Sequence, residues 1–311
     1  MTAHRLEPGP GSVRDAYSHE VAPALTVDPG DSIIVRTLDA TGHLEQQETP
    51  GEERPMMFAT RRGHCLAGPI AVRGARAGQL LSVRLASLRT DSWGYTAAGG
   101  RDNVLNRMVG AAEGEPAFLL WALDPDARVG VNQHGLRVPL APFLGVLGVA
   151  PAEPGEHSTI PPRSRVGGNI DCKELTAGSV LYLPVAVPDA YLFVGDGHAA
   201  QGDGEVGGTA IECGMTSELV LDLHDEAALD AVHAVTPTSR ITFGFSADLN
   251  AATGDALSSM LTWMRQLFGL DRPTVLALAS TMVDLRVTQV ANEVWGVHAV
   301  LPHALVPAAI S

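Results

Sequence analysis

The sequence predicts an α+β protein that is predominantly β, with sandwich- or barrel-like sheets and a late helical segment. Three observations lead to this class. The 33 glycines and 21 prolines divide the chain into short segments. Most of these segments combine a tight turn with an apolar run, which is typical of strands. Long helical periodicity begins only near residue 255, so the strands precede the helices, as in the α+β class.

A turn followed by an apolar strand recurs at residues 27–40, 72–88 and 176–190, without a fixed period. In each segment glycine can adopt the backbone angles of the turn, and a β-branched or leucine-rich run follows. Residues 51–62 and 151–168 are predicted to be loops. The second loop contains several prolines, which disfavour a regular element.

An amphipathic helix is predicted over residues 255–268, where apolar side chains recur at three- and four-residue spacing before Gly269. A second, shorter helix is expected after Asp271, with Pro273 in its first turn. We expect a β-rich region over residues 1–245, and a helical segment with a C-terminal strand over residues 246–311 that completes the same fold. The side chains of the first helix expected to face the sheet are Leu257, Leu261, Met264 and Phe268.

Composition and charge exclude several classes of protein. A hydrophobic content of 45% with 18% charged residues is typical of a globular protein, not a disordered one. The formal net charge is −14 and the chain has no long Lys/Arg cluster, so neither nucleic acid nor an anionic membrane is an expected partner. The sequence has no apolar run of membrane-spanning length, and its first residues lack the apolar region of a signal peptide, so we expect neither a membrane span nor a signal peptide. The three cysteines show no metal-finger spacing, and we expect reduced thiols in a cytoplasmic protein.

The stretch VGDGHAAQGDGEVGGTAIE, residues 194–212, places many ionisable groups in a glycine-rich backbone. It imitates a dinucleotide-binding fingerprint, but the glycines from residue 202 to 208 disfavour the helix that this fingerprint needs. Its acidic side chains would also repel a phosphate. The spacing of the acidic residues does not follow the ligand order of an EF-hand.

A ligand-bearing loop agrees better with this stretch, because glycines let the backbone fold tightly enough for short polar side chains to converge. If the chain stays extended after the strand YLFV, Asp196 and His198 project to the same face. A carboxylate with an imidazole suits Zn²⁺ or a similar divalent ion. A solvated surface turn with a structural aspartate is the alternative.

Two further stretches carry candidate site residues. GGNIDCKEL, residues 167–175, contains Asp171 and Lys173, the only lysine of the chain. RRGHCLAGPIAV, residues 61–72, places His64 near a Gly-Pro turn. Each residue also has a structural interpretation: Asp171 as a turn former, Lys173 in an exposed charge pair, and His64 as a hydrogen-bonded core histidine.

Together these stretches resemble the acetamidase/formamidase family of amide hydrolases. The resemblance runs from about residue 20 to the C-terminus, and it is carried by GHCLAGPIAV, GGNIDCKELTAGSVLYLPV, VGDGHAAQGDGEVGGTAIE and DLRVTQVANEVWGVHAVLP. It implies hydrolysis of short amides, such as formamide or acetamide, to the acid and ammonia. It also implies a β-rich catalytic fold with a late helical segment, a divalent metal such as zinc at the active site, and a homodimer or higher homo-oligomer.

The sequence departs from the family pattern at two places. Gly207 occupies a position that is commonly cysteine in relatives, so no thiol nucleophile can act there. Cys65, Leu66 and Ala67 stand where Pro-Leu-Thr is usual, which alters the expected wall of the substrate pocket.

Residue type suggests roles in amide hydrolysis, which needs a strong nucleophile, stabilisation of an oxyanion and a proton for the leaving nitrogen. Glu212 is the predicted proton shuttle and Lys173 the predicted oxyanion stabiliser. Zinc is the expected metal, because a bound divalent ion activates water and polarises a carbonyl. The predicted metal ligands are His64, Asp171, Asp196 and His198.

Two other functions are compatible with the sequence. Cys172 could be the nucleophile of a thiol-dependent amidase, which would require an exposed thiol with a stabilised thiolate. The chain could also be a non-catalytic β-sandwich that binds a small ligand or a metal.

Overall fold

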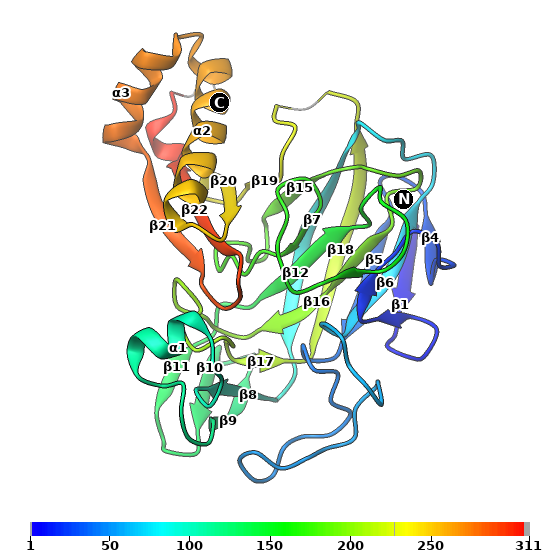
Figure 1. The fold of residues 1–311 in the computed structure, drawn as a ribbon. Helices are drawn as coiled ribbons and strands as arrows, with labels where there is room; N and C mark the ends of the chain where they lie inside the picture. Colours follow the sequence, from blue (N-terminus) through cyan, green and yellow to red (C-terminus); the bar gives the residue numbers. More distant parts are fainter. Residues whose placement is uncertain (1, 227, 308–311) are drawn as a thin grey trace.

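The computed structural model describes residues 2–226 and 228–307, and it confirms the predominantly β, α+β class. Two large sheets and one small sheet contain the strands. The long helices α2 (Leu249–Phe268) and α3 (Arg272–Met282) lie together at one end of the molecule (Figure 1). No helix in the described part of the chain is both long enough and apolar enough to cross a membrane.

The first sheet has nine strands and contains the predicted strands of residues 27–40, 72–88 and 176–190. Its order is β1 (Ala3–Leu6), β5 (Ser32–Thr37), β18 (Met215–His224), β7 (Leu80–Thr90), β15 (Val180–Pro184), β19 (His233–Val235), β20 (Ser239–Ser246), β22 (Trp295–Pro302) and β21 (Asp284–Gln289).

The second sheet has eleven strands. Its main path is β11 (Arg137–Pro139), β10 (Val129–Asn132), β9 (Ala117–Asp124), β8 (Trp93–Ala98), β17 (Glu212–Cys213), β16 (Leu192–His198), β12 (Phe143–Val149) and β14 (Gly167–Asn169). The strand β6 (Leu66–Val72) pairs with β16, and β2 (Val13–Arg14) and β4 (Leu25–Val27) pair with β6. The small sheet pairs β3 (Ala16–Tyr17) with β13 (His157–Ser158).

Side chains from both large sheets form one apolar core. Ile33 and Leu219 come from the first sheet, and Leu144 and Val194 from the second; none of the four is exposed to solvent. The strands β6, β12 and β16 are buried at every position. Polar residues on these strands are therefore held out of water and need partners within the protein.

The helix α2 begins six residues earlier than the sequence predicted, at Leu249 instead of residue 255. Asp248 caps it by accepting a hydrogen bond from the backbone N–H of Asn250. Gly254 weakens the helical propensity of the first turns, which concealed this start. Gly269 ends the helix in a left-handed conformation, as expected.

The helix α2 packs closely on β20 because Gly244 has no side chain. A Cβ at Gly244 would lie 2.0 Å from the carbonyl oxygen of Ala252. Leu261 and Met264 are buried in the cluster that α2 forms with β22, as predicted. Leu257 and Phe268 are partly buried against the same cluster.

The helix α3 confirms the second predicted helix. Asp271 caps it by accepting from the backbone N–H of Thr274, and Pro273 lies in its first turn. The domain division near residue 245 stays a prediction.

Sequence periodicity missed one short helix, α1 (Val104–Val109), which Asn103 and Gly110 cap at its two ends. Six residues are too few for an apolar period to stand out. The 3₁₀ helix η1 (His303–Leu305) follows β22. Residues 51–62 contain no helix and no extended strand, as predicted, and the loop over residues 151–168 is interrupted by β13 and by the start of β14.

Replacing Leu261 by alanine tests whether this face of α2 is part of the core. Leu261 is 4% exposed, and we expect Leu261→Ala to lower the free energy of unfolding by about 2–5 kcal/mol. Leu276, on α3, is 45% exposed and serves as a matched control, for which Leu276→Ala should cost no more than about 0.5 kcal/mol. Urea unfolding of both variants measures the difference. Equal unfolding midpoints would contradict the assignment.

Candidate active site

Asp196, His198 and Glu212 come together on the neighbouring strands β16 and β17, and β12 pairs with the other edge of β16. Asp196 and His198 lie at the end of the buried strand β16. On one side β17 pairs Glu212 with His198. On the other side β12 pairs Leu144 with Gly197, which places Gly145 next to Asp196. The strand pairing continues through residue 198, but the backbone at Asp196 is left-handed and not extended, so the predicted extension holds only in part.

The imidazole of His198 lies between two carboxylates. Its Nε2 is 3.3 Å from Asp196 Oδ1 and 3.2 Å from Glu212 Oε1. The backbone N–H of Ala210 donates to Glu212 Oε1 at 2.9 Å. All three site residues are buried, so these charges interact with little screening by solvent.

Gln201 positions the His198 ring and was not predicted from the sequence. Its Oε1 lies 2.9 Å from His198 Nδ1, and its Nε2 donates to the carbonyl oxygen of Asp171 at 2.8 Å. An acceptor at Nδ1 leaves Nε2 free to face the carboxylates and act as a ligand. An uncharged amide in a glycine-rich loop gave no signal for this role.

Asp171 and Glu205 complete the acidic cluster. The backbone N–H groups of Ile170 and Asp171 donate to the carbonyl oxygen of Gly145, at 3.0 Å and 3.2 Å. Ligand atoms of Asp171, His198 and Glu205 lie within 4.8 Å of one another, as do those of Asp196, His198 and Glu212. Glu205 was not predicted as a site residue from the sequence. Its position in the same glycine-rich, acidic loop as Asp196 could have indicated it.

His64 reaches the cluster from the segment before β6. Its Nε2 lies 4.0 Å from Asp196 Oδ2. Its backbone N–H donates to Thr159 Oγ1 at 2.8 Å, and the same hydroxyl lies 3.1 Å from Nδ1. Burial lowers the pKa of His64 below its usual value and outweighs the attraction of Asp196, which favours the neutral imidazole, the form that binds metals.

Burial and mutual repulsion perturb the acidic groups of the cluster. Burial, together with the neighbouring carboxylates, raises the pKa of Asp171 and of Glu205 well above the usual values. Burial also raises the pKa of Glu212 to about 7. Burial opposes ionisation of Asp196 too, but the neighbouring imidazoles of His198 and His64 outweigh it and lower the pKa of Asp196. The cluster therefore has more acidic groups than cations to balance them.

The donor set fits a divalent cation. Several buried ligand atoms have no hydrogen-bond partner within the described residues: both carboxylate oxygens of Asp171, Glu212 Oε2 and His198 Nε2. Buried polar atoms without partners are rare in native proteins, and a bound ion is one way to satisfy them. Carboxylate oxygens and imidazole nitrogens are ligands that zinc and related ions accept.

Gly145 leaves the space in which the ligand side chains converge. A Cβ at this position would lie 2.6 Å from Asp171 Oδ1, 2.6 Å from Asp196 Oδ2 and 2.9 Å from His198 Cε1. Such contacts are far shorter than van der Waals separation. Any side chain at residue 145 must therefore displace the carboxylates.

Three of the acidic site residues have left-handed backbone conformations. The φ angles are 53° at Asp171, 58° at Asp196 and 45° at Glu205. Non-glycine residues rarely adopt positive φ, and such strain concentrates at functional sites. The backbone here is held in a costly conformation that aims the carboxylates at one another.

A cavity of about 610 Å³ gives access to the cluster. His64, Asp196, Glu205 and Glu212 line it, and so does Gly207. Two predicted ligands, His64 and Asp196, and the predicted proton shuttle Glu212 thus line the cavity, whereas Asp171 and His198 are not among its described lining residues.

Lys173 and Cys172 point away from this cluster. Lys173 Nζ pairs with Asp203 Oδ1 at 2.9 Å, and neither Lys173 nor Cys172 is among the described residues that line the cavity. Oxyanion stabilisation by Lys173 stays a prediction. Cys172 is fully buried, and its thiol donates to Glu174 Oε2 at 3.3 Å. Burial and the Glu174 carboxylate raise the pKa of this thiol well above its usual value.

Comparison with known proteins finds similarity over nearly the whole chain. The model of the Acetamidase/Formamidase family matches residues 7–157 and 154–310. A formamidase of Methylophilus methylotrophus is 26% identical, over 63% of this chain and 60% of that protein. An acetamidase of Mycolicibacterium smegmatis is 28% identical, over 66% of this chain and 64% of that protein. The crystal structure of an acetamidase from Bacillus halodurans has a TM-score of 0.85 at 27% identity, covering 96% of this chain and 97% of that one.

Replacing Gly145 by alanine tests the role of the missing side chain. The added methyl group should displace Asp171 and Asp196, and we expect affinity for a divalent metal to fall about 10–100-fold, as when support of a ligand is lost. Titration calorimetry with Mn²⁺, an ion that carboxylates favour, measures this affinity. Gly254→Ala makes the same change on α2, where a Cβ meets nothing within 4 Å, and should leave the affinity unchanged. Equal affinities in the two variants would contradict the model of the site.

Proposed function

This chain belongs to the acetamidase/formamidase family of amide hydrolases, and from that membership we propose metal-dependent hydrolysis of short aliphatic amides to carboxylate and ammonia. Amides of the formamide and acetamide type are the proposed substrates. One observation carries the proposal: buried carboxylates and imidazoles, some with unpartnered ligand atoms, form one cluster, of which His64, Asp196 and Glu212 line a cavity.

We expect His64, Asp171, Asp196 and His198 to hold the metal, with zinc as the proposed ion. Glu205 joins the same ligand group and is an additional candidate. When bound, a divalent metal lowers the pKa of water to about 7 and polarises a carbonyl group. Gln201 and Thr159 would keep the two imidazole rings oriented through their other nitrogens, as supporting residues do in metal sites.

Glu212 is suited to move a proton during the reaction. Its Oε1 is fixed by the N–H of Ala210, whereas its Oε2 has no partner, and the residue lines the cavity. A carboxylate in this position can take a proton from water and deliver it to the departing nitrogen. The leaving group of an amide needs that proton, because an amide anion is a very poor leaving group.

The length of the acyl chain is a separate question from the reaction type. A cavity of about 610 Å³ lies within the range of sites that hold drug-sized ligands. A substrate panel should therefore extend beyond formamide and acetamide to longer and bulkier amides.

A thiol mechanism through Cys172 has less support. A nucleophilic thiol must be accessible and have a stabilised thiolate. Cys172 is buried, its pKa is raised, and its nearest charged neighbour is a carboxylate, which destabilises a thiolate.

The proposal includes an oligomeric assembly and a cellular location. We propose a homodimer or higher homo-oligomer, because Val104, Met108 and Val109 expose large apolar side chains together on α1. The three cysteines are all free, which agrees with a reducing compartment such as the cytoplasm.

Substitution of two ligands tests the metal site directly. Asp196→Asn and His198→Ala should each lose both bound metal and amide turnover while remaining folded, because an amide is a poor substitute for a carboxylate ligand and alanine offers none. Asp222→Asn and His134→Ala make the same chemical changes at exposed positions and should retain both properties. Elemental analysis and ammonia release provide the two readouts. Full turnover by a metal-free His198→Ala protein would refute the proposal.

Chelation separates the proposed mechanism from its alternatives. Ammonia release from the amide panel should stop when the protein is stripped of metal, and should return when Zn²⁺ is added. A thiol-dependent amidase would keep its turnover after stripping. Ammonia release from no amide at all, by metal-replete folded protein, would instead favour the non-catalytic ligand-binding alternative.

A further inference from the structure

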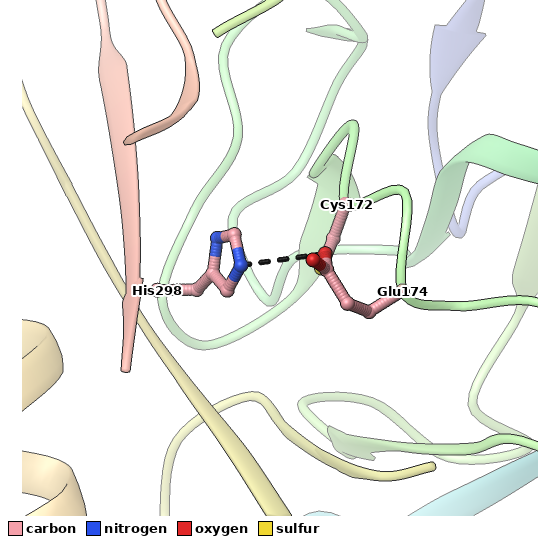
Figure 2. A group of neighbouring side chains, drawn as sticks. All are labelled: Cys172, Glu174 and His298. Atoms are coloured by element: carbon pink, nitrogen blue, oxygen red, sulfur yellow. Dashed lines mark hydrogen bonds and ion pairs between the residues drawn. The ribbon is translucent and has the colours of Figure 1, made fainter. Parts of the chain in front are cut away.

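A second cluster of metal-ligating side chains lies outside the cavity. It consists of Cys172, Glu174 and His298, which we term the cysteine cluster (Figure 2). Cys172 and Glu174 lie in the turn between β14 and β15, whereas His298 points toward them from β22. None of the three lines the cavity of the proposed active site, within the described part of the chain.

The spacing of the ligand atoms agrees with tetrahedral coordination. His298 Nε2 lies 3.3 Å from Glu174 Oε2, and Cys172 Sγ lies 3.3 Å from the same oxygen. All three ligand atoms lie within 4.8 Å of one another. Zinc bonded to sulfur, nitrogen and oxygen at its usual distances separates its ligand atoms by about 3.3–3.8 Å. Small movements would bring the three atoms onto a common ion.

The surroundings of His298 orient its Nε2 as a possible metal ligand. The residue is 1% exposed, and its Nε2, aimed at the other two ligands, has no hydrogen-bond partner among the described residues, only the ion-pair contact with Glu174 Oε2. Its Nδ1 lies 2.8 Å from Thr288 Oγ1. A hydrogen bond at one ring nitrogen orients the ring and presents the other nitrogen, which is the usual arrangement of metal-bound histidines. Thr288 is a positioning residue in this arrangement.

One carboxylate oxygen of Glu174 is hydrogen-bonded to Arg286, and the other faces the remaining members of the cysteine cluster. Arg286 Nη1 donates to Glu174 Oε1 at 2.9 Å, which leaves Oε2 to face Cys172 and His298. A divalent ion would balance the charge of this carboxylate and of a Cys172 thiolate, with the thiol proton released to solvent. Arg286 and Lys173 share the carboxylate of Asp203, at 3.9 Å and 2.9 Å, so one positive charge remains beside the site.

We propose that Cys172, Glu174 and His298 form a second metal site, selective for Zn²⁺ and similar thiolate-binding ions. A thiolate with an imidazole favours zinc over calcium or magnesium, unlike the carboxylate-rich cluster of the cavity. The ion would connect β22 to the segment that carries Asp171, one residue before Cys172. Its function would be to hold this segment in place, as structural zinc does in other proteins.

Cobalt spectroscopy can detect this site independently of amide turnover. Co²⁺ bound by a thiolate gives a near-ultraviolet charge-transfer band, whereas the proposed ligands in the cavity contain only oxygen and nitrogen donors. Whole protein, stripped by a chelator and verified metal-free, is titrated with Co²⁺ under anaerobic conditions. We expect a thiolate band that is complete within two equivalents per chain, because Co²⁺ also binds the proposed site in the cavity, and that is lost in Cys172→Ser and in His298→Ala.

The other two cysteines need a control because each adjoins a proposed active-site residue. Cys65 follows His64, and Cys213 follows Glu212. The double variant with Cys65→Ser and Cys213→Ser keeps Cys172 as its only thiol and leaves the cysteine cluster intact, so its band should equal that of the unmodified protein. This variant also decides the question if Cys172→Ser does not fold. Absence of a thiolate band in the unmodified protein, or its loss in the double variant, would overturn the proposal.

The two proposals fail in different ways. A thiolate band without amide turnover would support the cysteine cluster and refute the proposed function. Metal-dependent turnover with no thiolate band would do the reverse.

Discussion

Four carboxylates lie together out of water, and the cost of desolvating their charge is the constraint to which the surrounding structure responds. Each buried ion costs several kcal/mol unless partners compensate for the lost water. The pKa shifts show two responses. Against the effect of burial, the imidazoles of His198 and His64 lower the pKa of Asp196, which favours its charged form. Burial raises the pKa values of Asp171 and Glu205, which favours their neutral forms. A divalent cation would balance part of the negative charge of this cluster.

This arrangement needs a rigid support. Left-handed backbone at a non-glycine residue costs about 1–3 kcal/mol and persists only where its surroundings enforce it. Here the enforcement comes from β6, β12 and β16, which are buried at every position and belong to the core between the two large sheets. Gly145 contributes by the absence of a side chain, and its carbonyl oxygen fixes the backbone at Asp171. The geometry of the site therefore depends on the packing of the core.

Sequence reasoning was successful where the relevant information is local. Turn-and-strand segments predicted the β-rich class. Two-residue spacing at the end of a strand also predicted that Asp196 and His198 lie together, although the backbone at Asp196 is left-handed. It failed where contacts cross the sheet. Gln201 has no charge to mark it, and the importance of Gly145 depends on strand pairing that no local pattern specifies. The start of α2 was misplaced because capping by Asp248 overrides the weak propensity of Gly254.

The segment GGNIDCKEL shows why a motif can be recognised more easily than its roles can be divided. Four consecutive side chains make three different connections. Asp171 joins the cluster at the cavity, Lys173 pairs with the glycine-rich loop through Asp203, and Cys172 and Glu174 face β22. The left-handed conformation at Asp171 turns the chain so that adjacent residues serve opposite sides. Loss of any one connection would shift the backbone that positions the others. The segment is therefore constrained at nearly every position, whether a residue binds substrate, holds a metal or only fixes its neighbours.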